Sequence, residues 1–333
     1  MPAPSSSSSP AASSAVAATA PDPSPTQGSG SASGAAAESG AGSESRLGSR
    51  LGPVALVISA GISVQFGAAL AVMIMPRAGA AGVVTLRLAA AAIVLLLLCR
   101  PKVRGHSRSD WGTVLAFGVA MAGMNGLFYQ SIDRIPLGPA VTLEVLGPLA
   151  LSVIVSRRLV NVLWAGLALG GVVLLSGHGG GGLGFGSLDP LGAAFALGAG
   201  AMWAAYIVFS ARTGRRFPQA DGLALAMAVA AVISLPLGVA EAGSDLLVPS
   251  TLALGLGVAV LSSVLPYTLE LLALRRMPAP TFAILMSLEP AIAATAGFLV
   301  LNQAMSAVDA LAIALVIAAS MGAVRSQIRK KAA

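Results

Sequence analysis

Three ionisable side chains lie inside stretches that are otherwise strongly apolar: Arg87, Glu144 and Glu289. At the centre of a membrane-crossing helix, each charge would cost on the order of 2.5–3.5 kcal/mol unless it is paired or faces water. Arg87 and Glu144 fall at a similar depth from the same face, which favours an ion pair, whereas Glu289 has no evident partner. A buried carboxylate that gains and loses a proton can couple a solute to protons, so Glu289 and Glu144 are the candidate proton-coupling residues. Helix packing is the structural alternative for each.

Three prolines predict breaks in the helices around these charges. Inside a helix, proline lacks the donor for the carbonyl four residues earlier, so Pro148 frees that of Glu144, Pro266 that of Ser262, and Pro290 that of Met286. Free carbonyls persist in a membrane only against protein or water, which favours paired broken helices around a hydrated cavity near the midplane. The candidate substrate-binding residues are Gln65, Arg87, Asn125, Tyr129, Glu144, Trp203, Tyr206 and Tyr267. For the uncharged members of this set, packing or interface anchoring is an equal alternative.

The elements that must position these groups follow from composition: 56% of residues are hydrophobic, 10% are charged, and the mean hydropathy is +0.85. Runs near the ~20 residues that cross a bilayer core occur ten times. They cover residues 52–74, 82–98, 111–131, 137–156, 161–176, 191–211, 222–240, 251–274, 279–301 and 307–323. None alternates with a period of two, so helices rather than barrel strands must satisfy the backbone in lipid. The sequence predicts an all-α integral membrane protein with ten transmembrane helices.

An internal repeat divides these ten spans in half. Residues 136–148 and 278–290 share a pattern 142 positions apart, in which a proline opens the segment and a second proline closes it. Five spans per half is an odd number, so the second half enters the membrane from the opposite side, which predicts two inverted five-helix repeats. The predicted organisation is a disordered cytoplasmic tail (1–45), a first repeat (46–176), a Gly-rich outer loop (177–190), a second repeat (191–325) and a basic cytoplasmic tail (326–333).

The basic residues set the expected orientation. All of the 20 Lys and Arg except Arg77, Arg87 and Arg134 fall in one set of alternate loops and at the ends, which places both termini in the cytoplasm. Topology explains the net charge of +7, so no nucleic-acid partner is expected. Glu270 lies within a turn of a cytoplasmic helix end, where we expect it to reach the interface. No phosphate-binding loop, nucleophile motif or Cys/His metal pattern accompanies these spans, so neither an enzyme, a metal site nor a cofactor is predicted.

Four stretches carry a resemblance to a known family: PRAGAAGVVTLRLA (76–89), GMNGLFYQSIDRIPLGPAVTLEVLGPLA (123–150), LGAGAMWAAYI (197–207) and SSVLPYTLELLALRRMPAPTFAILMSLEPAIAA (262–294). They resemble the EamA-type drug/metabolite transporters, and among these the bacterial threonine and homoserine exporter group. The resemblance covers about residues 50–325. By position, it extends to Arg87, Trp203, Tyr267, Glu144 with Pro148, and Glu289 with Pro290. The chain departs at Asn302 and Gln303, where the family usually has Gly-Glu.

The resemblance implies a multi-pass protein of the bacterial inner membrane that exports small amino acids by alternating access, with proton antiport as the driving force. An amino acid is a zwitterion: its carboxylate suits Arg87 or the N-terminus of a broken helix, and its ammonium suits Glu144, Glu289 or freed carbonyls. Protons, a small-molecule substrate and the lipid bilayer are the expected partners. An exporter of hydrophobic drugs or other metabolites is the alternative within transport. A membrane scaffold or receptor that transports nothing is the alternative from another class.

Overall fold

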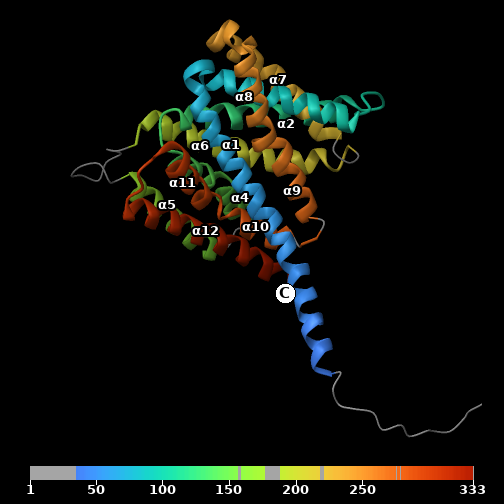
Figure 1. The fold of residues 1–333 in the computed structure, drawn as a ribbon, viewed down its shortest axis with the longest axis vertical. Coiled ribbons are helices and arrows are strands. Elements are labelled where there is room, and N and C mark those ends of the chain that lie inside the picture. The colour runs from blue at the N-terminus through green and yellow to red at the C-terminus, as the bar shows by residue number, and fades with distance from the viewer. Residues whose placement is uncertain are drawn as a thin grey trace, which may run out of the picture. The chain divides into compact units, whose positions relative to one another are not determined.

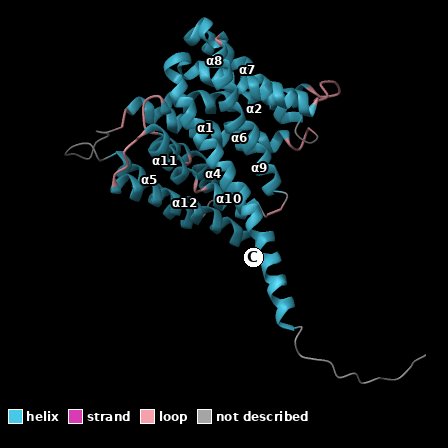
Figure 2. Cartoon of the chain, in the orientation of Figure 1, coloured by secondary structure: helices cyan, strands magenta, loops and turns pink. Residues whose placement is uncertain are grey.

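The computed structural model describes residues 35–156, 159–176, 188–217, 221–274, 276–277 and 279–332. Every regular element in these ranges is helical, as Figure 2 shows. The expected tail over residues 1–34 and the Gly-rich outer loop over residues 177–187 lie outside the described residues. The chain divides into two units, residues 1–47 and residues 48–333, and everything below concerns the second unit unless stated.

The helices follow one another with short connections, so the chain alternates direction repeatedly (Figure 1). The first half contains α1 (Ala35–Cys99), α2 (Arg108–Ile132), α3 (Leu137–Glu144), α4 (Leu146–Ser156) and α5 (Leu159–Ser176). The second half contains α6 (Pro190–Thr213), α7 (Asp221–Ala242), the 3₁₀ turn η1 (Gly243–Leu247), α8 (Pro249–Ala259), the π-helical turn η2 (Val260–Val264), α9 (Leu265–Leu274), α10 (Ala279–Met286), α11 (Glu289–Leu301) and α12 (Ala307–Ala332).

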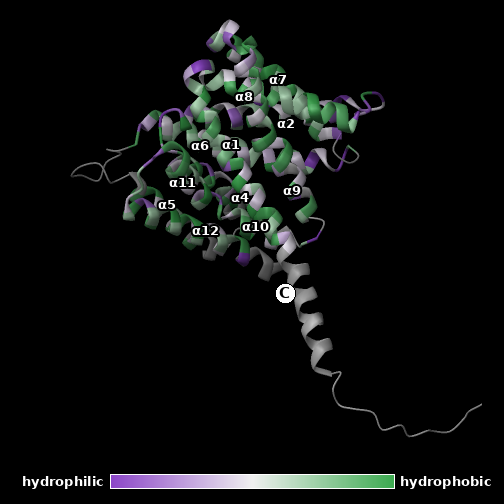
Figure 3. Cartoon of the chain, viewed as in Figure 1, coloured by the Kyte–Doolittle hydropathy of each residue, from purple (hydrophilic) through white to green (hydrophobic). Residues whose placement is uncertain are grey.

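Seven helices of the described chain are long and apolar enough to cross a membrane. Many large apolar side chains point outward; Leu98 and Ile154, for example, are 74% and 70% exposed. Figure 3 shows hydrophobic colour along most of the helices and hydrophilic colour gathered at their connections. Helices that are apolar on their outer faces as well as inside belong in lipid. The protein is therefore an all-helical, multi-pass membrane protein.

The first two expected spans, 52–74 and 82–98, form one helix with a kink. Gly79, at φ 65°, is the non-helical residue inside α1. Its conformation leaves backbone donors of the following turn without helical partners, and Glu241 of α7 supplies the acceptors. The Glu241 carboxylate accepts from the backbone N–H of Ala80 at 3.2 Å and of Ala81 at 2.6 Å. A carboxylate also suits the positive end of a helix, so Glu241 joins α7 to the second arm of α1.

Both ends of the helical region differ from the sequence expectation. Helix α1 begins at Ala35, so residues 35–45 are helical where a disordered tail over residues 1–45 was predicted. Helix α12 continues to Ala332, through the basic segment 326–333 that was predicted to be a separate tail. The C-terminal segment is rich in Gln, Arg, Lys and Ala, which are good helix formers, whereas residues 35–45 carry two glycines, and their helix is not explained by composition.

Contacts between the two halves of the chain build the interior. Helix α2 packs against α6 and α7, α5 packs against α12, and α3 packs against both α11 and α6. Small residues permit the closest approaches. A Cβ on Gly138 of α3 would lie 2.9 Å from the Ala294 Cβ of α11, and one on Gly118 of α2 would lie 2.5 Å from Val229 of α7. Close backbone approach of this kind is typical of helix contacts in membranes.

Candidate functional site

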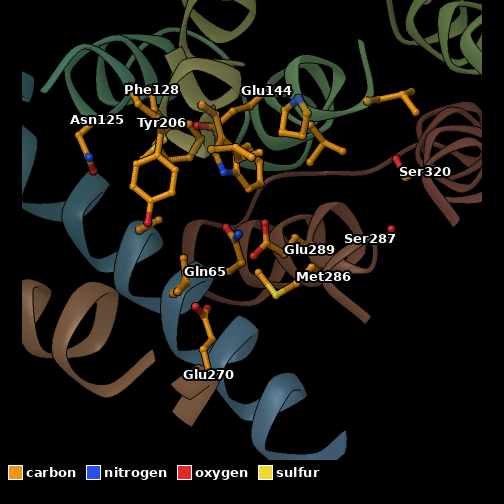
Figure 4. A pocket seen from close by; sticks show the side chains of 18 of the residues that line it. Gln65, Asn125, Phe128, Glu144, Tyr206, Glu270, Met286, Ser287, Glu289 and Ser320 are labelled. Atoms are coloured by element: carbon orange, nitrogen blue, oxygen red, sulfur yellow. The ribbon is translucent and has the colours of Figure 1, made fainter. Parts of the chain in front are cut away.

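A cavity of about 480 Å³ lies among the helices of the two halves. Its lining comes from α1, α2, α3, α4, α6, η2, α9, α10, α11 and α12, and Figure 4 shows most of the lining side chains. Of the residues singled out from the sequence, Gln65, Arg87, Asn125, Glu144, Pro148, Trp203, Tyr206 and Glu289 line this space. We call it the central cavity. Its volume falls in the range of small-molecule sites, about 300–1,000 Å³.

The remaining sequence candidates are not among its described lining residues. Tyr129 is fully buried behind the wall of the cavity, where its hydroxyl contacts Arg87. Pro266 follows the π-helical turn η2, and Pro290 lies in the first turn of α11. Tyr267 lies in α9, but its side chain falls outside what the structure describes.

Arg87 is held by neighbours other than the predicted one. Its Nη1 donates to the Tyr129 hydroxyl at 3.2 Å, and its Nε donates to the Ser263 hydroxyl at 3.2 Å. Its Nη2 donates to the Ser262 carbonyl at 3.0 Å. Arg87 forms no ion pair with Glu144 within 4.0 Å, so the expected pair is absent from this structure. Similar depth along two helices was an insufficient guide, because it says nothing of the direction in which each side chain points.

The Ser262 carbonyl is the group that Pro266 was predicted to free. Pro266 has no backbone N–H to donate, and the helix accommodates this with a π-helical turn over Val260–Val264. In this turn the N–H of Leu265 donates to the Val260 carbonyl. π-Helical turns inside α-helices are frequent at functional sites. The Ser262 carbonyl is thus available to Arg87. Proline and arginine together explain how a charged side chain is held at this depth.

The first broken helix consists of α3 and α4, which are separated by Val145. Pro148 removes the donor for the carbonyl of Glu144, and that carbonyl lies against the backbone of Gly200 in α6. Gly147 also touches this part of α6, since a Cβ there would overlap the Gly200 carbonyl. The break is therefore packed against protein backbone, while the half-buried Glu144 side chain lines the central cavity.

The second broken helix consists of α10 and α11, separated by Ser287 and Leu288. Glu289 is the first residue of α11, and Pro290 follows it. The Glu289 side chain is only 8% exposed, yet it lines the central cavity. In Figure 4 it projects toward the same part of the cavity as Gln65. A carboxylate in the first turn of a helix lies at the positive end of the helix dipole.

Two polar features of the cavity include residues, Glu270, Ser262 and Ser320, that were not singled out as site residues from the sequence. Glu270 of α9 lines the cavity as a third carboxylate, although it was expected to reach the interface. Three lining residues carry a buried side-chain oxygen that has no hydrogen-bond partner among the residues that the structure describes: Gln65, Ser262 and Ser320. An unsatisfied buried oxygen costs about 1–3 kcal/mol, so these groups favour a polar occupant or water. The sequence did point to Ser262, because Pro266 lies four residues after it, whereas nothing in the sequence distinguished Ser320.

The connection between α11 and α12 carries the two residues that depart from the family pattern. Asn302 adopts φ 52° at the end of α11, a conformation that glycine favours and asparagine tolerates. The side-chain Oε1 of Gln303 accepts from the backbone N–H of Leu137 at 3.0 Å. Gln303 therefore caps the first turn of α3 and links the two halves of the chain. A glutamate at this position could accept the same hydrogen bond.

The arrangement has the chemistry of a zwitterion-binding site. One guanidinium and three carboxylates line a single space whose other walls are largely apolar and aromatic, including Phe128, Trp203 and Tyr206. Among the described residues, no three His, Cys, Asp or Glu side chains are grouped closely enough to hold a metal ion. A ligand with a cationic and an anionic group could therefore find an opposite charge at each end.

Comparisons with known proteins show the family of the chain. The profile of the EamA-like transporter family matches residues 190–325. Threonine/homoserine exporter RhtA of Salmonella typhimurium (strain LT2) is 43% identical over 270 residues, which is 81% of this chain and 90% of that protein. The protein of the same name from Escherichia coli (strain K12) is 42% identical over the same shares. One solved crystal structure, at 18% identity, superposes with a TM-score of 0.54 over 83% of this chain and 98% of that one, which supports the fold. The chain belongs to the EamA-like transporter family.

Proposed function

We propose that this protein exports small amino acids of the threonine and homoserine class across the bacterial inner membrane, by alternating access coupled to proton antiport. The observation that carries the proposal is the central cavity, in which Arg87 and the carboxylates of Glu144 and Glu289 line one space. The relatives named threonine/homoserine exporter support the substrate class. The apolar walls give room for a short side chain, and the charged groups give it orientation.

Within the cavity, the substrate carboxylate binds near Arg87 and the ammonium binds among the glutamates. Arg87 is already held by Ser263, Tyr129 and the Ser262 carbonyl, so its guanidinium is positioned before the substrate arrives. Pre-positioned charges lose less entropy on binding. Glu289 carries the proton, because it lies deep in the cavity wall and makes no ion pair with the described residues. The proton and the substrate bind in turn in the central cavity, so that one crosses the membrane in exchange for the other.

We further propose ten transmembrane helices in two inverted repeats, with both termini in the cytoplasm. Helix α3 and helix α10 have eight residues each, and their bounds differ by 142 positions at both ends. The kink at Gly79 divides the 48-residue apolar part of α1, which is long enough for two crossings. In a Cys99→Ser background, cysteines at Asp133 and Asp245 should label from outside intact cells, and cysteines at Arg104 and Arg215 should not.

Counterflow in proteoliposomes tests the function. Vesicles loaded with unlabelled threonine should take up external labelled threonine transiently, and homoserine inside should replace threonine. A scaffold or receptor gives no counterflow with any solute. An exporter of hydrophobic drugs gives counterflow with lipophilic cations and none with threonine. Threonine and homoserine tolerance of cells that overproduce the protein is the matching test in vivo, with empty-vector cells as the control.

A further inference from the structure

A second cavity, of about 540 Å³, lies next to the central one. Its lining comes from the last turns of α1 and α6, the start of α7, and the η2–α9 region. One end of this space is lined by residues at helix ends beside the basic loops, namely Cys99, Thr213 and Gly222. Those loops are cytoplasmic in the proposed orientation. We call this space the inner cavity.

The two cavities meet at two side chains. Of all described lining residues, Tyr206 and Glu270 are the ones that line both spaces. Tyr206 is steadied by Phe117, whose ring centroid lies 5.1 Å away. Glu270 has no hydrogen bond or ion pair with any residue that the structure describes, so its carboxylate is available to a ligand. Figure 4 shows Glu270 set apart from the other carboxylates, with its side chain directed into the central cavity.

Asp221 at the start of α7 acts electrostatically on Cys99, and Glu270 adds a negative charge to the lining of the inner cavity itself. It is the one carboxylate among the described residues that line this space. The helix ends around it carry basic residues such as Arg100 and Arg212, which would repel a cation approaching from the cytoplasm. A half-buried carboxylate at the junction provides the opposite potential where the path leaves those loops, and a low-dielectric wall strengthens that potential.

We propose that the inner cavity is the cytoplasmic entrance for substrate and that Glu270 binds the substrate ammonium at the junction with the central cavity. The substrate class rests on the proposed function; the position and charge of the junction do not. Glu270 receives the amino group first, and Tyr206 narrows the passage beside it. The ammonium then moves on to the carboxylates of the central cavity, while the substrate carboxylate reaches Arg87.

The single cysteine of the chain makes the charge of this space measurable. Cys99 lines the inner cavity with Glu270, and purified full-length protein can be modified there by methanethiosulfonates that carry either a trimethylammonium or a sulfonate group. The ratio of the cationic to the anionic rate reports the local potential. Because a low-dielectric wall strengthens the field of a single charge, removal of one negative charge in Glu270→Gln should lower the ratio by about threefold or more, while Asp221 stays unchanged in every variant.

Controls separate charge from folding. Thr268→Val removes a polar group from the same helix and cavity but no charge, so its ratio should match the parent. Glu270→Asp should also keep the ratio, and Cys99→Ser should abolish modification. A Glu270→Gln variant that is folded and keeps the parental ratio overturns the proposal. If that variant does not fold, the test uses the parent protein alone, with and without threonine. Threonine should slow the modification of Cys99, and the absence of any protection would overturn the proposal.

Transport gives the second readout. Glu270→Gln should raise the threonine concentration for half-maximal efflux by about tenfold, because a charged hydrogen bond is lost, while the maximal rate stays within about twofold. Glu270→Asp should recover most of the affinity. A fall in the maximal rate with unchanged half-saturation contradicts binding at the junction. A parent that does not transport threonine overturns the proposed function alone, and the modification ratio still decides the role of Glu270.

Discussion

The two broken helices share a frame but differ in where they place a carboxylate. Helices α3 and α10 occupy positions 142 apart in the chain, and Pro148 and Pro290 follow them at the same offset. In the first break, Glu144 ends the half-helix and Gly147 stands just beyond it. In the second break the carboxylate has the other position: the apolar Met286 ends the half-helix, and Glu289 lies just beyond it, where the first break has Gly147.

Packing explains why the charge cannot occupy the same place in both. Gly147 touches the backbone of Gly200, which leaves no room for a side chain. Glu289 instead has the central cavity in front of it. Glu144 lies at the negative end of α3, whereas Glu289 lies at the positive end of α11. The duplicated break thus presents two carboxylates in unlike surroundings. We assign proton coupling to Glu289 because it is the more buried of the two and makes no ion pair with the described residues, and substrate affinity to Glu144.

The largest effect should come from closing the space at the first break. Gly147→Ala places a methyl group into the Gly200 carbonyl, and two backbones must separate, at a cost on the order of 3 kcal/mol. We expect little folded protein by size-exclusion chromatography and a clearly lower melting temperature. Gly126→Ala in α2 is the matched control, because no atom lies within 4 Å of the added Cβ. Normal folding of Gly147→Ala would show that the break is not packed as described.

The next effect concerns coupling at the second break. Glu289→Gln removes the titrating group and keeps its size and hydrogen-bonding capacity. Exchange of threonine should remain within about threefold of the parent, whereas accumulation driven by a pH gradient should fall by tenfold or more, to the level of vesicles without a gradient. The amount of folded protein is scored beside the flux. Accumulation equal to that of the parent would make the Glu289 carboxylate structural.

A smaller effect is expected for the affinity residues. Glu144→Gln should weaken threonine binding about tenfold, the value of one charged hydrogen bond. Since Arg87 is held by Tyr129, Ser263 and a carbonyl rather than by Glu144, adding Arg87→Gln should not rescue stability. Without a direct ion pair, the coupling free energy between the two changes should stay below about 1 kcal/mol in melting experiments, although Arg87 still acts on Glu144 electrostatically. A double variant more stable than Arg87→Gln alone would indicate an ion pair after all.

The smallest effect should arise at the connection that follows the second broken helix, between α11 and α12. Gln303→Leu removes the acceptor for the Leu137 N–H and should cost about 1 kcal/mol of stability. Gln303→Glu should preserve the hydrogen bond and the melting temperature. Should both variants melt like the parent, the cap on α3 would contribute nothing measurable to holding the halves together.

Local rules explain what could be predicted from the sequence. The apolar spans identified a helical membrane protein, and proline spacing placed both breaks within a few residues, because the donor that proline lacks acts at a fixed distance along the chain. The freed carbonyl of Ser262 is the clearest case, since its predicted need for a partner is met by Arg87. Such inferences need no knowledge of how helices are arranged around one another.

What could not be predicted depends on that arrangement. Depth along a helix suggested an Arg87–Glu144 pair, but the rotation of each helix about its axis sends the guanidinium elsewhere. Glu270 was expected at the membrane interface because it lies near a helix end in the sequence. In the structure its side chain lines the inner cavity instead. Ser320 is one of many small residues in apolar sequence. Only the packing of the helices shows that its buried hydroxyl has no partner among the described residues.

Proton-driven accumulation tests the central claim most directly. Proteoliposomes with the parent protein, acidic inside by one pH unit and with the membrane potential clamped, are placed in labelled threonine. Protons leaving by antiport should draw threonine inward up to about tenfold above equilibrium for one-to-one exchange, since one pH unit is worth 1.36 kcal/mol. A protonophore should abolish the gradient of threonine. Threonine that only equilibrates, in vesicles whose counterflow shows active protein, would contradict proton antiport.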